Sequence, residues 1–205
     1  MAAGARFEPD SGAERSAFGM ETPRIVIEKV MPVVSYGHKP AKAIVGQLFK
    51  VTSNVYCLTS GPLAVIVRWR HVDSCDGESQ YMHTLGNRVW YGQILFAQPG
   101  PHVFCIDAWI DSYAGYCLTL EKAMQADTSP AELIDLGLAH IFRAYEHCDA
   151  SRQQPLIELH QRLSLLPPPA QITLLMSETT KALMRDTQLR TCLTLSPEYP
   201  LYVVR

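Results

Sequence analysis

The sequence has no long apolar run and no closely spaced metal ligands, and each absence excludes a class of protein. No apolar stretch approaches the ~20 residues of a membrane-spanning helix, and the N-terminus lacks the apolar core of a signal peptide. The nearest two of the six cysteines, Cys105 and Cys117, are twelve positions apart, which excludes Cys-x-x-Cys metal and redox motifs. The seven histidines form no His-x-x-x-His pair. We therefore expect a cytoplasmic protein with reduced cysteines and no metal site.

The sequence also lacks an excess of charge of one sign and a phosphate-binding loop. A formal net charge of −2 gives no electrostatic reason to expect nucleic acid or a membrane as a partner. No glycine-rich loop precedes a helical pattern, so a nucleotide-binding motif is not indicated. With 47% hydrophobic and 19% charged residues, the composition is that of an ordinary globular protein.

The chain changes its hydrophobic period near residue 111. Residues 1–23 are rich in Ala, Gly, Ser and Glu without periodicity and predict a disordered leader. Short β-branched and aromatic runs separated by turn residues then predict strands. They are expected at 24–30, 47–57, 63–70, about 81–83, 88–96, 102–110 and 200–205. This spacing is typical of an antiparallel β-sandwich of immunoglobulin type.

Between the strands expected at 102–110 and 200–205, apolar residues recur at helical spacing. Residues 113–126 predict a linking helix, and Ser129-Pro-Ala-Glu132 forms a capping box that opens a second one. Apolar stripes continue to about Leu183, interrupted by prolines at 167–169 that we expect to end a helix. We predict an α+β fold in which residues 24–112 and 197–205 form the sandwich and residues 113–196 form an inserted antiparallel helical bundle.

Three segments carry a resemblance to a known family. The first begins with an Arg24-Ile-Val-Ile strand, continues through Pro-Val-Val, and ends with the turn Gly37-His-Lys-Pro-Ala-Lys-Ala-Ile-Val-Gly46. The second is Asn87-Arg-Val-Trp-Tyr-Gly92. The third is Ala108-Trp-Ile-Asp111. They resemble the N-terminal region of the bacterial α-1,4-glucan:maltose-1-phosphate maltosyltransferases, relatives of glycoside-hydrolase family 13.

The resemblance implies a supporting role in a maltosyltransferase, without the catalytic part. Those enzymes transfer maltosyl units from maltose 1-phosphate to α-1,4-glucan with retention, without a metal or organic cofactor, on a (β/α)8 barrel that follows this region. A barrel needs roughly 250 residues, so these 205 do not contain one beside other domains. The resemblance therefore implies a non-catalytic accessory region that packs against the barrel and helps to form a homodimer, and that meets glucan and maltose 1-phosphate only through the full-length enzyme.

Two carboxylates are candidates for a catalytic pair. Retaining glycosidases use two carboxylates about 5 Å apart in a sugar-binding cleft, and Asp107 and Asp111 flank Trp109. We expect Asp111 instead to cap the following helix. No catalytic, cofactor-binding or metal-binding residue is assigned, and the chain alone is expected to be inactive.

The tryptophans support a second hypothesis, a stand-alone glucan-binding sandwich. Sugars stack on exposed aromatic rings, and the strands carry Trp69, Trp90 and Trp109. We expect Trp90 and Trp109 to fill the core. Trp69 lies between Arg68 and Arg70 and is the candidate glucan contact. A third hypothesis is a truncated interaction domain that dimerises without chemistry.

Overall fold

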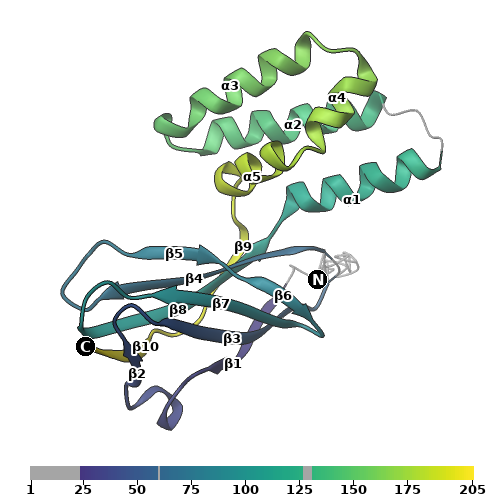
Figure 1. Cartoon of the computed structure of the whole chain (residues 1–205). Coiled ribbons are helices and arrows are strands. Elements are labelled where there is room, and N and C mark those ends of the chain that lie inside the picture. The colour runs from purple at the N-terminus through teal and green to yellow at the C-terminus, as the bar shows by residue number, and fades with distance from the viewer. Residues whose placement is uncertain (1–23, 60, 127–130) are drawn as a thin grey trace, which may run out of the picture.

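The chain forms a β-sandwich and a group of helices that stands beside it (Figure 1). The computed structural model describes residues 24–59, 61–126 and 131–205. The strands are β1 Ile25–Met31, β2 Ala41–Ile44, β3 Leu48–Cys57, β4 Leu63–His71, β5 Glu78–Tyr81, β6 His83–Gly86, β7 Val89–Leu95, β8 Gly100–Ile110, β9 Thr191–Leu195 and β10 Tyr199–Val204. The helices are α1 Ser112–Gln125, α2 Ala131–His147, α3 Ala150–Ser164, α4 Pro168–Leu175 and α5 Glu178–Thr187.

Two sheets make up the sandwich. The smaller has the strand order β1-β3-β7-β6, and the larger has the order β2-β10-β8-β4-β5, with β9 also paired to β8. The pairings are antiparallel except for β10 with β2, which run parallel. The predicted α+β class with a sandwich and helices is confirmed, and the expected antiparallel pairing is departed from only at β2, on the edge of the larger sheet.

Alternating side chains build the core between the two sheets. In β3, Val51, Ser53 and Val55 are buried, whereas Thr52 and Asn54 are more exposed. In β4, Val65 and Val67 belong to the core, whereas the equally buried Ala64 and Ile66 belong to a separate cluster with Trp109. Because successive side chains of a strand point to opposite faces, each strand contributes every second residue to the core. The sheet faces that point away from this core are called outer faces below.

The helices have a hydrophobic core of their own. It is a cluster separate from the sandwich core and contains Tyr113, Leu120, Ile141, Leu163, Leu175 and Met184 among its buried members. The buried Tyr113 hydroxyl donates to the Leu175 carbonyl at 2.9 Å, which ties α1 to the end of α4. The apolar stripes read from the sequence are thus the faces that meet in this core.

The Gly37–Gly46 segment contains a strand that the sequence reasoning did not predict. Gly46 has a φ of +73°, a conformation that residues other than glycine rarely adopt, and it turns the chain from β2 into β3. Its N–H donates to the Phe96 carbonyl at 3.1 Å, which ties this turn to the end of β7. Between the two glycines, residues 41–44 form β2 on the parallel edge of the larger sheet.

The helical region differs from its predicted bounds at the C-terminal end. We expected the bundle to extend to residue 196, but the last helix ends at Thr187 and Thr191–Leu195 form β9 beside β8. The prolines at 167–169 not only end α3 but also begin α4, because proline is favoured in the first turn of a helix. The stripe from Ile172 to Leu183 is divided between α4 and α5.

A polar clasp joins the two connections between sandwich and helices. The Asp111 carboxylate accepts from the Ala114 N–H at 2.9 Å, so Asp111 caps α1 as predicted. The same oxygen accepts from the Gln188 side-chain amide at 2.8 Å. The Gln188 amide oxygen accepts in turn from the Ser112 hydroxyl and the Tyr113 N–H. Asp111 and Gln188 are both buried, so the clasp fixes the outgoing and returning segments to each other.

Two predictions lie outside the described residues: the disordered leader at 1–23 and the capping box that begins at Ser129. Among the helices described, none has the length and apolar character needed to cross a membrane.

Candidate functional site

The outer face of the larger sheet is the surface on which the unusual residues gather. Strand register places three successive zones on it: an apolar corner on β2 and β10, a charged cluster on β4 and β8, and Trp109 at the end of β8. The helices follow directly on β8 and return directly into β9, so the Trp109 end lies next to them (Figure 1).

The apolar corner consists of side chains that nothing in the described chain covers fully. Ile44, Tyr202 and Val204 are 41%, 47% and 37% exposed. Val204 pairs with Ile44 across the parallel edge, and Tyr202 pairs with Pro101 on the other side. We call Ile44, Pro101, Val103, Pro200, Tyr202 and Val204 the outer-face patch. Contiguous apolar side chains of this kind are typical of a surface that packs against another polypeptide.

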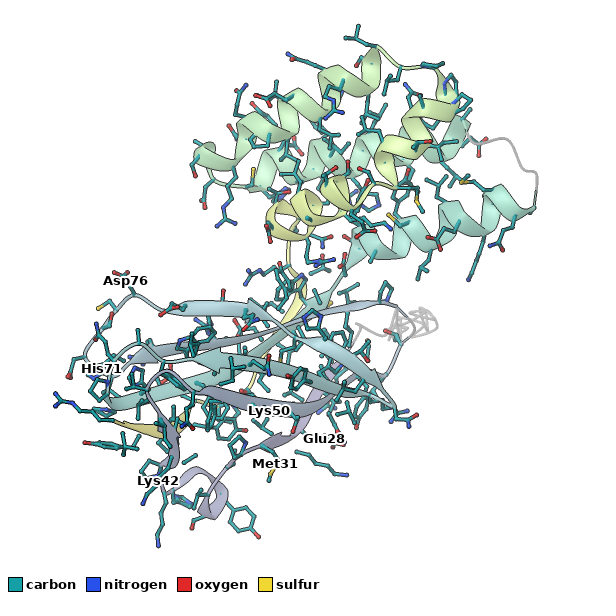
Figure 2. All side chains as sticks on the ribbon, in the orientation of Figure 1. Glu28, Met31, Lys42, Lys50, His71 and Asp76 are labelled. Atoms are coloured by element: carbon teal, nitrogen blue, oxygen red, sulfur yellow. The ribbon has the colours of Figure 1, made fainter. Side chains whose placement is uncertain are left out.

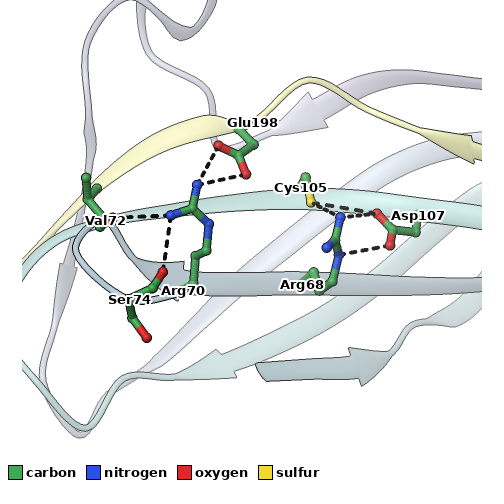
Figure 3. Close-up of polar contacts among 7 residues, drawn as sticks. All are labelled: Arg68, Arg70, Val72, Ser74, Cys105, Asp107 and Glu198. Carbon is green, nitrogen blue, oxygen red and sulfur yellow. Dashed lines mark hydrogen bonds and ion pairs between the residues drawn. The ribbon is translucent and has the colours of Figure 1, made fainter. Parts of the chain in front are cut away.

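On the same face as this patch, Arg68 and Asp107 form a bidentate ion pair (Figure 3). The Arg68 Nε lies 2.9 Å from one Asp107 oxygen, and an Arg68 terminal nitrogen donates to the other at 3.3 Å. The Asp107 side chain is 4% exposed, and the Cys105 thiol donates to the same carboxylate at 3.7 Å. Burial, followed by the charge of Asp107, raises the pKa of Cys105 to about 11, so the thiol stays protonated and is a poor nucleophile.

A second arginine lies two residues along the same strand. Arg70 donates to both carboxylate oxygens of Glu198, at 3.2 and 3.1 Å, and to the carbonyls of Val72 and Ser74 (Figure 3). Between the two ion pairs is a hollow of about 220 Å³, lined also by Cys75, Gly77 and Phe104. Both guanidinium groups already have carboxylate partners, so the hollow is close to neutral.

The two carboxylates that flank Trp109 do not form a catalytic pair. Asp107 is held by Arg68 on the sheet face, and Asp111 is occupied by the N-terminus of α1 and by Gln188. A general acid and a nucleophile must both face the substrate, whereas these two buried groups are used by the protein itself. Within the described ranges, no group of three or more His, Cys, Asp or Glu residues is placed to hold a metal ion.

The tryptophans are located differently from what the sequence suggested. Trp69 is 8% exposed and belongs to the sandwich core, so its ring offers little surface on which a sugar could stack. Trp90 is half-buried against the same core and donates to the Val55 carbonyl at 3.0 Å. Trp109 is fully buried as expected, but on the outer face, packed with Ala64 and Ile66.

The helices present an apolar groove of their own. It lies between α2 and α3, has a volume of about 230 Å³, and is lined by Ile141, Phe142, Tyr145, Leu156, Ile157, His160 and Gln161. The Phe142 side chain is 60% exposed although it is large and aromatic. Such a side chain beside an apolar groove is typical of a protein–protein contact.

The remaining surfaces of the sandwich are more polar. Exposed Glu28 and Lys50 lie on neighbouring strands of the smaller sheet (Figure 2). His71 and Asp76 lie at the end of the sandwich that is far from the helices, where the His71 ring meets that of His102 edge-on at 4.9 Å (Figure 2). A cavity of about 180 Å³ lies beside His71 and Asp76, and its lining mixes the positive charge of Arg70 with the carboxylates of Asp76 and Glu78.

Sequence reasoning missed the two ion pairs. The alternation along β4 did contain a signal, because Arg68 and Arg70 are two residues apart and must share the outer face. Their carboxylate partners gave no signal, since Glu198 lies 128 residues from Arg70 in the sequence.

Comparison with known proteins gives one consistent result. The sequence model for "Alpha-1,4-glucan:maltose-1-phosphate maltosyltransferase, domain N/S" matches residues 23–205. The maltosyltransferase of Pseudomonas aeruginosa is 29% identical over 192 residues, which are 91% of this chain and 28% of that enzyme. That of Methylacidiphilum infernorum is 27% identical over 157 residues, 71% of this chain and 23% of the enzyme. The chain therefore spans less than a third of the length of these relatives.

Proposed function

Since the chain belongs to the family of N/S domains of the α-1,4-glucan:maltose-1-phosphate maltosyltransferases, we propose that it is the non-catalytic accessory region of such an enzyme. The enzyme would transfer maltosyl units from maltose 1-phosphate to α-1,4-glucan in the cytoplasm. The match to 91% of this chain but 28% of the Pseudomonas aeruginosa enzyme carries the proposal, because it gives this region one place in a larger enzyme. The six free cysteines agree with a reducing compartment.

The engaged carboxylates support the non-catalytic part of the proposal. Asp107 and Asp111 are both buried and bound to other groups of the chain. We expect the 205-residue protein to release no phosphate from maltose 1-phosphate in the presence of glycogen. Turnover that copurifies with the protein and disappears in Asp107→Asn would refute this part of the proposal.

The accessory role itself would rest on two apolar surfaces. The outer-face patch is proposed to pack against the catalytic barrel of the full-length enzyme, because an apolar sheet face that is left exposed is typical of a packing interface. The groove between α2 and α3 is proposed to form a homodimer contact, in which two copies bury Phe142 around a two-fold axis. The separate hydrophobic clusters support treating the sandwich and the bundle as two domains.

Sedimentation equilibrium at micromolar concentration tests the dimer. We expect the unmodified protein to sediment as a dimer and Phe142→Ser as a monomer. Leu165→Ser is the matched control, because Leu165 is 85% exposed in α3's C-cap and does not line the groove. A monomeric unmodified protein, or equal dissociation in both variants, contradicts the assignment of this groove.

A separate experiment tests the alternative that the chain is a stand-alone glucan-binding module. Affinity for maltooligosaccharides that is lost in Trp69→Ala, while the variant remains folded, would favour it over the accessory role. Because Trp69 is a core residue, we expect this variant instead to lose about 3–5 kcal/mol of stability.

A further inference from the structure

A cavity separates the outer face of the larger sheet from the helices. It has a volume of about 530 Å³, within the range of small-molecule sites. The sheet contributes Ile66, Ser79 and Tyr81, and the helices with the segment that follows them contribute Arg152, Asp186 and Arg190 among others. The cavity is distinct from the hollow between the two ion pairs, with which it shares no lining residue.

The charged residues that line this cavity are Arg152, Arg190 and Asp186, which leaves a formal excess of one positive charge. Neither Arg152 nor Arg190 forms an ion pair with any described residue, unlike Arg68 and Arg70 on the same side of the molecule. Arg152 is held in place by one bond from its terminal nitrogen to the Asp186 carbonyl at 2.9 Å. The Arg190 guanidinium carbon lies 4.2 Å from the centre of the Trp109 ring, a cation–π contact that helps to hold the group in place.

The wall between the arginines is polar but not acidic overall. The Tyr81 hydroxyl lies 3.1 Å from the Arg185 carbonyl and 3.2 Å from a carboxylate oxygen of Asp186, so Asp186 is partly satisfied within the wall. The Trp109 ring lies edge-on to Tyr81, and its buried indole N–H has no partner among the described residues. Lining residues Ile66, Pro155 and Leu183 add apolar surface.

We propose that this cavity binds a small phosphorylated saccharide, with the phosphate between Arg152 and Arg190. Arginine presents a planar set of donors that matches phosphate oxygens. The hydroxyl and carboxylate groups of the wall suit sugar hydroxyls, and its apolar part suits the C–H face of a sugar ring. The choice of a glycosyl phosphate rests on the proposed function, whereas the anion site rests on the two arginines alone.

Binding there would couple the two parts of the chain. The ligand would touch β4 and β5 on one side and α3 and α5 on the other, so it would stabilise one orientation of the helices relative to the sandwich. An accessory region could in this way sense the phosphorylated donor without taking part in chemistry.

Isothermal titration of the 205-residue protein tests the site, with maltose 1-phosphate as the probe. We expect saturable binding that weakens at least about tenfold in Arg152→Gln and in Arg190→Gln, because each removes a charged hydrogen-bond donor set. Arg162→Gln is the matched control: it removes the same charge from the other end of α3, outside the cavity. Maltose and inorganic phosphate are titrated in parallel.

The outcomes separate the hypotheses. Binding of maltose 1-phosphate lost in both cavity variants but retained in Arg162→Gln supports the site. Absence of saturable binding at millimolar ligand, or equal loss in all three variants, overturns it. Inorganic phosphate that binds as tightly as maltose 1-phosphate overturns the saccharide part. Circular dichroism confirms folding of each variant. If Arg190→Gln unfolds, Arg152→Gln gives the decisive result, because Arg152 is exposed and its side chain bonds only to the Asp186 carbonyl among the described residues. The proposed accessory function is tested by a different measurement. Maltosyl transfer by the chain alone would contradict that function without bearing on the anion site.

Discussion

Replacing Gln188 by alanine should loosen the junction between the sandwich and the helices. The Gln188 side chain makes three hydrogen bonds there: its amide nitrogen donates to Asp111, and its oxygen accepts from Ser112 and from the Tyr113 N–H. The residue is 8% exposed, so water does not readily replace these partners. The clasp is the polar link between the segment that enters the helices and the segment that leaves them.

The size of the effect follows from the groups that lose their partner. The Tyr113 N–H would be left buried without an acceptor, and Asp111 would keep its capping bond to Ala114 but lose its second donor. A buried polar group without a partner costs about 1–3 kcal/mol. With two groups affected and partial relaxation, we expect Gln188→Ala to lower the free energy of unfolding by about 3 kcal/mol.

Urea unfolding followed by circular dichroism measures this loss. For a protein of this size, it corresponds to a fall in melting temperature of about 6–12 °C. Gln154→Ala is the matched control, because Gln154 is exposed on α3 and its side chain bonds only to exposed Glu158. We expect that variant to change stability by less than about 0.5 kcal/mol. If Gln188→Ala is as mild as Gln154→Ala, the clasp does not hold the junction and the reasoning is wrong.

Three further predictions concern packing, protonation and thiol reactivity. Gly137→Ala should destabilise by about 1–3 kcal/mol in urea unfolding, because its new methyl group would collide with the Tyr116 hydroxyl. Burial and then Arg143 lower the pKa of His140, so the unfolded chain binds this proton more readily than the folded one. Stability should therefore fall as the pH drops through the unfolded value near 6.5, and His140→Gln should flatten this dependence. Iodoacetamide at pH 8 should label exposed Cys75 and spare Cys105; the reverse order by mass spectrometry would contradict the burial of Cys105.

Much of the fold could be predicted from local patterns. β3 was predictable because buried and more exposed side chains alternate along it, and β4 because it begins with a run of apolar and β-branched residues. α2 and α3 were predictable because Ile134 and Ile141, and likewise Leu156 and Leu163, recur at helical spacing and do meet in the core. The capping role of Asp111 was predictable from its place just before a helical period.

The short strands were not predictable in the same way. β2 has four residues and β9 has five, and neither shows a strong pattern of its own. β2 is held by its parallel pairing to β10, a strand that lies far along the chain, and β9 by its pairing to β8. Edges of this kind depend on a neighbour that is remote in sequence, so local propensity does not reveal them.

By itself, the sequence determined the two hydrophobic periods, the change between them near residue 111, and the motifs of the family. Those features are local, since alternation, helical stripes and turn glycines act within a few residues. The tertiary structure alone decided which aromatic rings are buried and which charges are paired. Trp69 lies between two arginines in the sequence, but the pleat turns it into the core and turns both arginines outward. Arg152 and Arg190 are 38 positions apart, and they line one cavity only because the helices fold back against the sheet, which no local pattern encodes.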